Sequence, residues 1–385
     1  MRVLIAPDGF GGTLSPAAAA GAMAAGWRTS SPHDELDVAP LSDGGPGFVD
    51  VLAVALPAAS HRRVLVHDPL GRPVPAGLLL DGSTAYVESA AACGLHLVAP
   101  AQRDVRGSTS YGVGELVLAA LDAGATRIVV GLGGSATNDG GAGLLVALGL
   151  VLRDAAGEEL APGGSPLRKL AGLGGRPDPR LASVELVAAT DVDSPLLGLR
   201  GASAVFGPQK GASREDVALL DGALARWADA LEEHLGVRVR EDPGAGAGGG
   251  TGAALLALGA TRTSGLALVV DAVRLAARVA AADLVVTGEG TFDASSLAGK
   301  VVSGVAALAG EQAVPCLVLA GSVRVGRREL GAAGIEAAYS LEDACGVEQA
   351  MERPAEELEA LTARVARQWS PPGRATVEGS GAPVR

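Results

Sequence analysis

Short apolar runs alternate along the chain with alanine- and leucine-rich stretches, and glycine-rich loops separate them. Residues 2–7 have the pattern of a buried strand, and an alanine-rich helix is predicted to begin at Ser15-Pro16, with Ser as the N-cap and Pro in the first turn. A second strand is predicted at 36–41, and a second helix runs through 49–52. This order predicts an open parallel sheet, in which ligands bind beyond the carboxyl ends of the strands.

The pattern changes near Ser60, where extended segments follow one another without helices between them. These segments are predicted at 64–66, 74–80 and 84–87, and the turns that separate them indicate antiparallel strands. Strands of the buried, parallel type return later in the chain, at 284–286, 316–319 and 337–339.

The length of 385 residues exceeds that of one ordinary core, so two domains are expected. The simplest organisation is an α/β fold in which a discontinuous domain, 1–64 plus 280–370, is interrupted by a second α/β domain at 65–279. The tail at 371–385 is expected to be disordered. Hydrophobic residues make up 48% of the chain but aromatic residues only 3%, so Ala, Val and Leu must build the core. Such a core favours helices packed closely on parallel strands.

Charge and composition exclude several classes of function. The net charge of −12, without a basic stripe, argues against nucleic acid as a partner. The three cysteines form no C-x-x-C pair and the five histidines are scattered, so neither a zinc site nor a histidine triad is supported. Neither a signal peptide nor an apolar run of about 18 residues is evident. We therefore expect a cytoplasmic protein that binds no membrane, while a homo-oligomer stays open.

The most informative stretch is RIVVGLGGSATNDGGAGLLVAL at 127–148. A β-branched run meets a glycine-rich turn, and an Ala/Leu helix follows. Glycines let backbone N–H groups approach an anion, and the next helix points its positive end toward it. The Asn138-Asp139 pair suggests that a metal ion or a hydroxyl is also held. A second loop of this kind, at 243–252, runs into another Ala/Leu helix.

Acidic residues occupy several loops that follow apolar runs. Carboxylates at strand ends, beside glycine loops and a lysine, suit Mg²⁺-assisted phosphoryl transfer, because Mg²⁺ takes oxygen ligands and catalysis rests on positioning and charge neutralisation. Each one alone is more often a turn former or a helix cap. The acids in these loops are Asp8, Asp43, Asp139, Asp191, Asp193, Glu289 and Asp293.

Lysine is rare in this chain. Only Lys169, Lys210 and Lys300 are lysines among 31 basic residues, and the last two lie in glycine-rich segments. Their placement suggests that a compact ammonium is needed there, although chance placement on exposed loops is the alternative.

A dinucleotide-dependent oxidoreductase is a weaker alternative. No Walker A motif and no protein-kinase motif set is present. Gly131-x-Gly133-x-x-Ala136 matches the loose dinucleotide fingerprint, and Asp154 follows at about the expected interval. The Asn-Asp-Gly-Gly run, however, breaks the helix that should begin at the third small residue.

Six segments in order, VLIAPD…GTLS, LSDGG, GLGGSATNDGGAG, GASAVFGPQKGA, PGAGAGGGTGAAL and VVTGEGTFDASSLAGKVVSGVA, together resemble the bacterial glycerate kinases. The resemblance covers nearly the whole chain, to about residue 345. It implies a Rossmann-like domain interrupted by a second α/β domain, with the active site in the cleft between them. It also implies phosphorylation of D-glycerate with ATP and Mg²⁺, usually to 2-phosphoglycerate.

The resemblance implies roles for particular residues. The expected catalytic residues are Asp191, Asp293 and Lys300. The expected substrate-binding residues are Asp8, Asp43, Gly44, Gly45 and Ser110. The expected nucleotide-binding residues are Gly133, Gly134, Ser135, Thr137, Asn138, Lys210, Gly246, Gly248, Gly249 and Gly250. The expected metal ligands are Asp139, Asp193 and Glu289.

Pro46 stands where the family has an acid, and three positions that carry cations in the family lack them here. Gly11 stands where the family has a lysine, and Tyr111 and Thr291 stand where it has arginines. Arg103 and Arg106 are nearby in sequence to Tyr111 and are candidates to replace a lost cation. These departures keep open a second hypothesis, a catalytically silent or substrate-shifted relative that binds a small hydroxy-acid.

Overall fold

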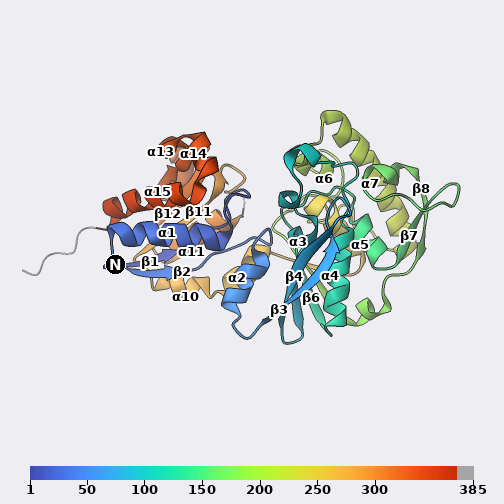
Figure 1. Cartoon of the computed structure of the whole chain (residues 1–385), viewed down its shortest axis with the longest axis horizontal. Helices are drawn as coiled ribbons and strands as arrows, with labels where there is room; N and C mark the ends of the chain where they lie inside the picture. Colours follow the sequence, from blue (N-terminus) through green and yellow to red (C-terminus); the bar gives the residue numbers. More distant parts are fainter. Residues whose placement is uncertain (298, 371–385) are drawn as a thin grey trace, which may run out of the picture.

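A computed structural model describes residues 1–297 and 299–370, and the tail expected to be disordered lies outside the described residues. The chain forms two lobes, each built around its own β-sheet (Figure 1). The first lobe contains a five-stranded, fully parallel sheet in the order β13-β12-β11-β1-β2. Its strands are β1 (Arg2–Ile5), β2 (Glu35–Val38), β11 (Leu284–Phe292), β12 (Cys316–Val323) and β13 (Ala337–Ser340). The predicted parallel strands are thereby confirmed.

Helices cover both faces of the five-stranded sheet. On one face, α1 (Pro16–Ser30) and α15 (Pro354–Trp369) pack over the side chains of Val3 and Ile5, with Trp27 fully buried. On the other face, α11 (Val301–Glu311) packs over Leu4 and Val285. Alternate residues of each strand face opposite sides, so one short apolar run serves two cores.

The start of α1 confirms its predicted capping. Ser15 accepts a hydrogen bond from the N–H of Ala18 at 3.2 Å, and Pro16 occupies the first turn. The cap satisfies one of the N–H groups that the helix itself leaves free, and Pro16 has no N–H to satisfy.

The topology of this sheet reverses between β1 and β11. From β1 the chain moves to one edge, at β2, whereas from β11 it moves to the other edge through β12 and β13. The N–H of Asp8, beyond the end of β1, donates to Gly288 O of β11 at 2.8 Å. In open parallel sheets, ligands bind at such a switch point, outside the carboxyl ends of the strands.

The second lobe contains a six-stranded mixed sheet in the order β10-β9-β6-β5-β4-β3. The pairs β3–β4 and β4–β5 are antiparallel, as predicted, and the other pairs are parallel. The strands are β3 (Ser60–His67), β4 (Pro73–Asp81), β5 (Thr84–Glu88), β6 (Arg127–Gly131), β9 (Glu185–Ala189) and β10 (Thr261–Thr263). A separate hairpin joins β7 (Leu150–Asp154) to β8 (Leu170–Gly175).

One large core fills the outer face of the six-stranded sheet, where Trp227 and Leu224 of α7 are fully buried. The helices that contribute to it are α3 (Ala90–Cys93), α4 (Tyr111–Asp122), α5 (Ala142–Ala147), α6 (Ala202–Phe206), α7 (Arg214–Leu235) and α8 (Thr251–Ala257). Short 3₁₀ helices lie in the connections, at Leu95–Leu97, Pro100–Gln102, Ser165–Lys169, Pro179–Ser183, Pro208–Lys210 and Ala247–Gly249.

Two helices form a layer between the sheets. The helix α2 (Phe48–Ala55) follows β2 of the first sheet in the chain, yet it packs against β4 and β5 of the second sheet and against α9 (Gly265–Ala272). Figure 1 shows α2 at the waist between the lobes. Phe48 and Val269 belong to the same buried cluster as Leu4 of β1, so the two lobes share one continuous core.

The remaining helices lie in the first lobe and complete its outline. They are α10 (Leu275–Ala280), α12 (Arg327–Ala332), α13 (Leu341–Cys345) and α14 (Val347–Glu352). Across the part of the chain that the structure describes, no helix is both long enough and apolar enough to cross a bilayer.

Candidate functional site

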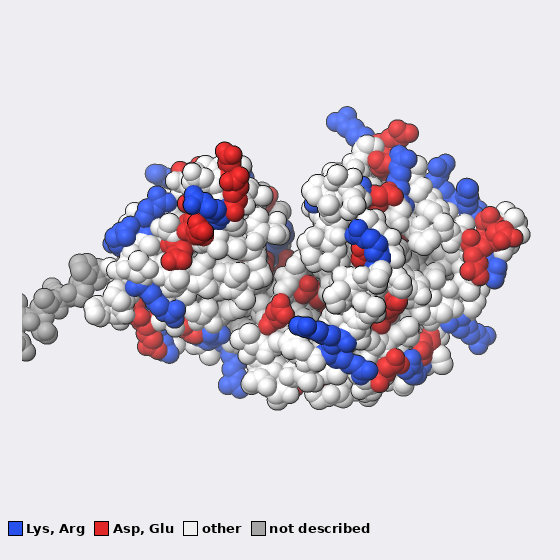
Figure 2. Space-filling model, in the orientation of Figure 1, with Lys and Arg blue, Asp and Glu red and all other residues white. Residues whose placement is uncertain are grey.

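The carboxyl ends of both parallel strand sets meet where the lobes join. The loop after β2 carries Asp43 and Gly44 and lies on the ends of β6 and β9. A Cβ on Gly44, whose φ is +99°, would approach Ala189 O to 2.9 Å. A Cβ on Gly265, at the start of α9, would lie 2.1 Å from Asp43 O. Glycine therefore permits three backbones to meet here. Figure 2 shows a hollow between the two lobes.

Five charged side chains from distant parts of the chain influence one another at this junction, and we call this group the acidic crevice. Its members are Asp8, Asp43, Asp191, Glu289 and Lys300. Besides burial, the charge of Asp43 raises the pKa of Asp8, and the charge of Asp191 raises the pKa of Asp43. Lys300 opposes both shifts. Such effects require proximity, so sequence positions from 8 to 300 converge at one place.

Glu289 is the member with the clearest unmet bonding capacity. Burial raises the pKa of its carboxyl group to about 7, and the charges of Asp293 and Asp43 add to the rise, while Ser296 and Lys300 oppose it. Its Oε1 atom is buried and has no hydrogen-bond partner among the described residues. A buried acceptor without a donor is costly, and at a cleft it indicates that a ligand or a cation completes the site.

Asp191 follows β9 and reaches the N-terminus of α9. Its Oδ2 accepts the backbone N–H of Leu266 at 2.9 Å, and this bond orients the carboxylate. Asp193, two residues later, behaves differently. It pairs with Arg262 at 2.5 Å, and its side chain is 80% exposed.

Asp293 and Lys300 lie beyond the end of β11. Asp293 Oδ1 accepts hydrogen bonds from the N–H of Ser295 at 2.7 Å and from its hydroxyl at 2.6 Å. The Ser295 hydroxyl bond is the largest cause of the lowered pKa of Asp293. Lys300 donates to Ser295 Oγ at 3.3 Å and directly precedes α11. These contacts hold a cation at the mouth of the acidic crevice.

Glu88 is a residue of the junction that the sequence analysis missed. It ends β5, and its Oε2 accepts the N–H groups of Gly47 at 2.9 Å and Val49 at 3.4 Å. The carboxylate thus caps α2 and ties the Asp43 loop to the six-stranded sheet. Burial raises its pKa to about 7, although these N–H donors oppose the rise. Its position at a strand end, like those of the selected acids, was the available signal.

The two glycine loops, residues 131–143 and 244–252, pack on each other, and we call them the glycine-loop pair. The N–H of Gly140 donates to Gly249 O at 3.0 Å. A Cβ on Gly249 would lie 1.9 Å from Thr137 O, and one on Gly250 would lie 2.6 Å from Gly140 Cα. The requirement for glycine at 249 and 250 is therefore explained by contact between the loops, without any ligand.

Polar side chains of the glycine-loop pair, and Lys210 next to it, are also directed into the protein. Lys210 is 2% exposed, and its Nζ donates to Ser135 Oγ at 2.9 Å and to Thr137 O at 2.7 Å. Burial lowers its pKa to about 8. Asn138 donates from Nδ2 to Ser203 Oγ at 2.8 Å, and its buried Oδ1 has no partner among residues 1–297 and 299–370. Lys210 thus stabilises the loop at 131–143 through hydrogen bonds made inside the protein.

The metal group expected from Asp139, Asp193 and Glu289 does not form. Asp139 is fully buried, and its Oδ2 accepts from the N–H and hydroxyl of Ser110 at 2.8 and 2.9 Å and from Gly143 N at 3.2 Å. Within the described ranges, no three His, Cys, Asp or Glu side chains are grouped closely enough to hold a metal ion. Asp139 and Ser110 instead bind each other, because a buried carboxylate must find donors.

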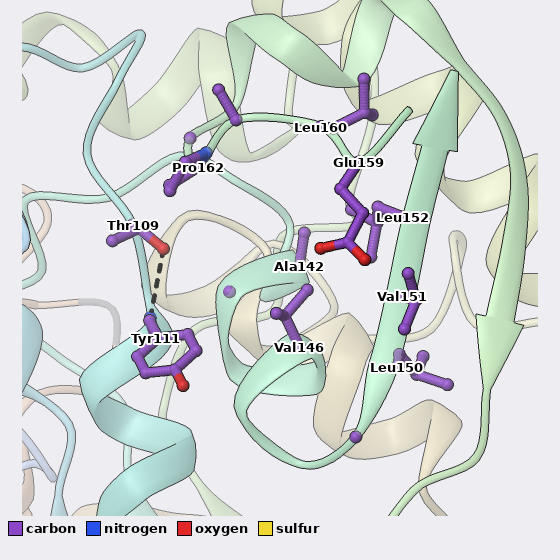
Figure 3. Close-up of a pocket in the computed structure, with 14 residues that line it drawn as sticks. Thr109, Tyr111, Ala142, Val146, Leu150, Val151, Leu152, Glu159, Leu160 and Pro162 are labelled. Carbon is purple, nitrogen blue, oxygen red and sulfur yellow. Dashed lines mark hydrogen bonds between the residues drawn. The ribbon is translucent and has the colours of Figure 1, made fainter. Parts of the chain in front are cut away.

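The positions that depart from the family pattern separate in space. Tyr111 lines a cavity of about 320 Å³ between α4, α5 and β7 (Figure 3), where its N–H donates to Thr109 Oγ1 at 3.2 Å. Gly11 and Thr291 instead line a smaller cavity in the first lobe. Arg106 is paired with Asp216, so it is committed elsewhere.

The comparisons with known proteins agree with one another. The model of the "Glycerate kinase family" matches residues 3–370. The chain is 44% identical to glycerate kinase of Bacillus subtilis (strain 168), over 93% of this chain and 95% of that protein. It is also 44% identical to glycerate 2-kinase of Escherichia coli (strain K12), over 89% of this chain and 90% of that protein. A crystal structure of glycerate kinase 2 from Salmonella typhimurium LT2 superposes with a TM-score of 0.73 at 44% identity, covering 96% of this chain and 98% of the other.

Proposed function

Because the chain belongs to the glycerate kinase family and is a phosphotransferase with an alcohol acceptor, we propose that it uses ATP and Mg²⁺ to phosphorylate D-glycerate. The proposed product is 2-phosphoglycerate. The Escherichia coli relative, which is named a glycerate 2-kinase, supports this position of transfer.

The observation that carries the proposal is the acidic crevice at the switch point of the five-stranded sheet. Phosphoryl transfer depends on holding several anions together and neutralising the charge of the transferred group. Carboxylates alone would repel both substrates, so the crevice needs a cation besides Lys300. The crowded, raised-pKa carboxyls of Asp8 and Glu289, and the unpartnered Glu289 Oε1, are consistent with that need.

The residues of the crevice fit Mg²⁺. This ion is usually held by one or two carboxylates, with waters and substrate phosphates completing the shell, so a preformed group of three protein ligands is not required. Glu289 of β11 and Asp8, beyond the end of the adjacent β1, would hold it. When bound, Mg²⁺ supplies positive charge that offsets the charge of the nucleotide phosphates.

The remaining residues have separate tasks in the proposed reaction. Asp191, oriented by the Leu266 N–H, accepts the proton of the glycerate hydroxyl as that oxygen bonds to the γ-phosphorus. The bond between the γ-phosphorus and the β,γ-bridging oxygen breaks, and ADP leaves with the bond's electron pair. Lys300 provides a positive charge near the phosphates. The Asp43 loop, which Glu88 holds in place, forms the side of the crevice where glycerate binds.

A coupled ADP-release assay tests this proposal. D-glycerate, L-glycerate and a panel of related hydroxy-acids are supplied with ATP and Mg²⁺, and phosphorus NMR identifies the position of the new phosphate. We expect turnover with D-glycerate and a 2-phosphate product. Ligand-induced thermal stabilisation without ADP release for any hydroxy-acid would establish the silent relative instead, and NAD binding without an ATP effect would establish the oxidoreductase.

A further inference from the structure

A cavity of about 140 Å³ opens at the carboxyl ends of β1, β11 and β12, and we call it the edge pocket. It lies at the switch point, beside the acidic crevice. Gly290, which lines it, directly follows Glu289, and Phe10, which also lines it, lies two residues after Asp8. The edge pocket and the acidic crevice therefore lie at the same end of the five-stranded sheet, within two residues of each other along both chain segments.

Backbone without side chains forms the floor of the edge pocket. A Cβ on Gly290 would lie 2.6 Å from Gly11 N, and one on Gly321 would lie 2.4 Å from Gly290 O. Three chain segments thus touch there as bare backbone. A Cβ on Gly11, in contrast, would meet nothing within 4 Å. Close backbone contact below and open space above give a flat surface that a planar group can approach.

The walls of the edge pocket are mainly apolar. Leu341 and Ala350 are buried in its side, whereas Val347 and Met351 stand at its rim with 59% and 62% of their surface exposed. Large apolar side chains left in water next to a cavity are typical of a ligand-binding groove. Both rim residues come from one short helix, α14.

The charges of the edge pocket select against an anion. Glu342 is the charged residue that lines it, and its Oε2 accepts a hydrogen bond from Arg324 Nη2 at 2.6 Å. Thr291 and Ser322 add hydroxyl groups, which bond to each other at 3.4 Å. A carboxylate or phosphate would meet the Glu342 charge with no lysine or arginine among the lining residues. An uncharged planar ring with polar edges suits apolar walls and a few hydroxyls better.

We propose that the edge pocket binds the purine base of the nucleotide, with the phosphates extending past Gly290 toward Glu289 and Lys300. This assignment rests on the proposed function and specifies where its nucleotide lies. It differs from the sequence-based expectation, which placed the nucleotide on the glycine-loop pair; those loops pack closely on each other. The base lies in the first lobe, and the second lobe supplies Asp191.

Isothermal titration with three probes tests the assignment without turnover. The probes are adenosine, which has only the base and sugar, a non-hydrolysable ATP analogue, and tripolyphosphate, which has no base. Met351→Glu places a carboxylate at the exposed rim, and Val347→Glu repeats the change one turn away. We expect each variant to weaken adenosine and the ATP analogue at least tenfold, and tripolyphosphate less than twofold.

A matched control is Val205→Glu, which puts the same charge on an exposed valine of α6 in the other lobe. Steady-state kinetics adds an independent readout: KM for ATP should rise in both rim variants, while KM for D-glycerate changes less than twofold. The assignment is overturned if both rim variants bind the ATP analogue like the wild type, or if tripolyphosphate binding falls in parallel. If both rim variants turn over D-glycerate normally with an unchanged KM for ATP, the assignment of the base to the edge pocket is rejected and the proposed function is not. If the protein turns over no substrate but still binds adenosine and the ATP analogue in a way that the rim variants weaken, the proposed function alone is rejected.

Discussion

The acidic crevice and the glycine-loop pair contain the same kinds of residues in the same kind of place, yet their charged groups differ in how far the protein itself satisfies them. At the glycine-loop pair, the carboxylate of Asp139 and the ammonium of the adjoining Lys210 are hydrogen-bonded within the protein, and the Asn138 amide oxygen is a buried acceptor without a partner among the described residues. In the crevice, carboxyls raise one another's pKa, and Glu289 Oε1 has no partner among the described residues.

This difference separates residues that stabilise the fold from residues that take part in the reaction. A buried polar group whose bonds are all made inside the protein has little left for a ligand, and its removal costs stability. A carboxylate that lies close to other carboxylates and lacks hydrogen-bond donors destabilises the protein until a ligand binds. Such a group therefore indicates a functional site. Variants in the two regions should therefore fail in different ways, one in turnover and the other in folding.

The largest effect is expected for Asp191→Asn. The amide cannot accept the hydroxyl proton, so kcat/KM should fall on the order of 10³-fold, while the melting temperature stays close to that of the wild type. The matched control is Asp193→Asn, two residues away and 80% exposed, which should change kcat/KM less than twofold. The ADP-release assay and a thermal melt measure both quantities. Near-normal turnover in Asp191→Asn would remove this residue from the reaction.

In the glycine-loop pair, Gly249→Ala should mainly destabilise the fold. Its Cβ would collide with Thr137 O at 1.9 Å in a backbone with φ of +70°, so we expect a loss of about 3 kcal/mol in the free energy of unfolding. Gly11→Ala is the control, because its φ is also positive but its Cβ would be unobstructed. It should lose about 1 kcal/mol. Urea denaturation measures both, and equal losses would mean that the loop contact contributes nothing.

Glu88→Gln tests how the stability of the junction depends on pH. The pKa of Glu88 is raised by burial to about 7 in the folded state, from an ordinary value of 4.5. The folded protein therefore binds this proton more tightly than the unfolded chain does. The resulting stabilisation is fully present below pH 4.5 and is lost as the pH rises through about 7.

The wild type should accordingly lose up to about 3 kcal/mol of stability relative to Glu88→Gln between the two pKa values. Urea titrations of both proteins from pH 4.5 to 8 give this difference directly, since other groups, including nearby Asp50, are common to both. If the two proteins show parallel pH dependences, the buried cap of α2 does not titrate in this range.

The smallest effect is expected for Asp139→Asn, at about 2 kcal/mol of stability. The amide nitrogen would face donors, from Ser110 and Gly143 or from Gly141, that the carboxylate now accepts. The folded protein should nevertheless keep most of its turnover, because Asp139 lies outside the crevice. Activity per folded molecule, from the assay combined with the denaturation curve, checks this. Complete loss of turnover at full stability would restore Asp139 to the reacting centre.

Much of the architecture could be predicted from the sequence. Local signals identified the strands of the five-stranded sheet, the cap of α1 at Ser15 and the antiparallel start of the six-stranded sheet, because apolar alternation, capping and turns depend on residues close in the chain. The β7–β8 hairpin and the edge strand β10 were not predicted. Membership of the glycerate kinase family was also readable from six motifs in order, and is now established. The proposed domain limits at 64 and 280 stay a prediction.

The division of labour among the acids, in contrast, was decided by the tertiary structure alone. Whether an aspartate is occupied or available depends on partners far away in the chain: Glu88 meets Gly47 across 41 positions, and Lys210 meets Ser135 across 75. The sequence determined where acids and glycines follow strands. Only the folded chain determined which of them are buried together, since burial and hydrogen bonding, which set the charge state and reactivity of a side chain, are properties of its neighbours in space.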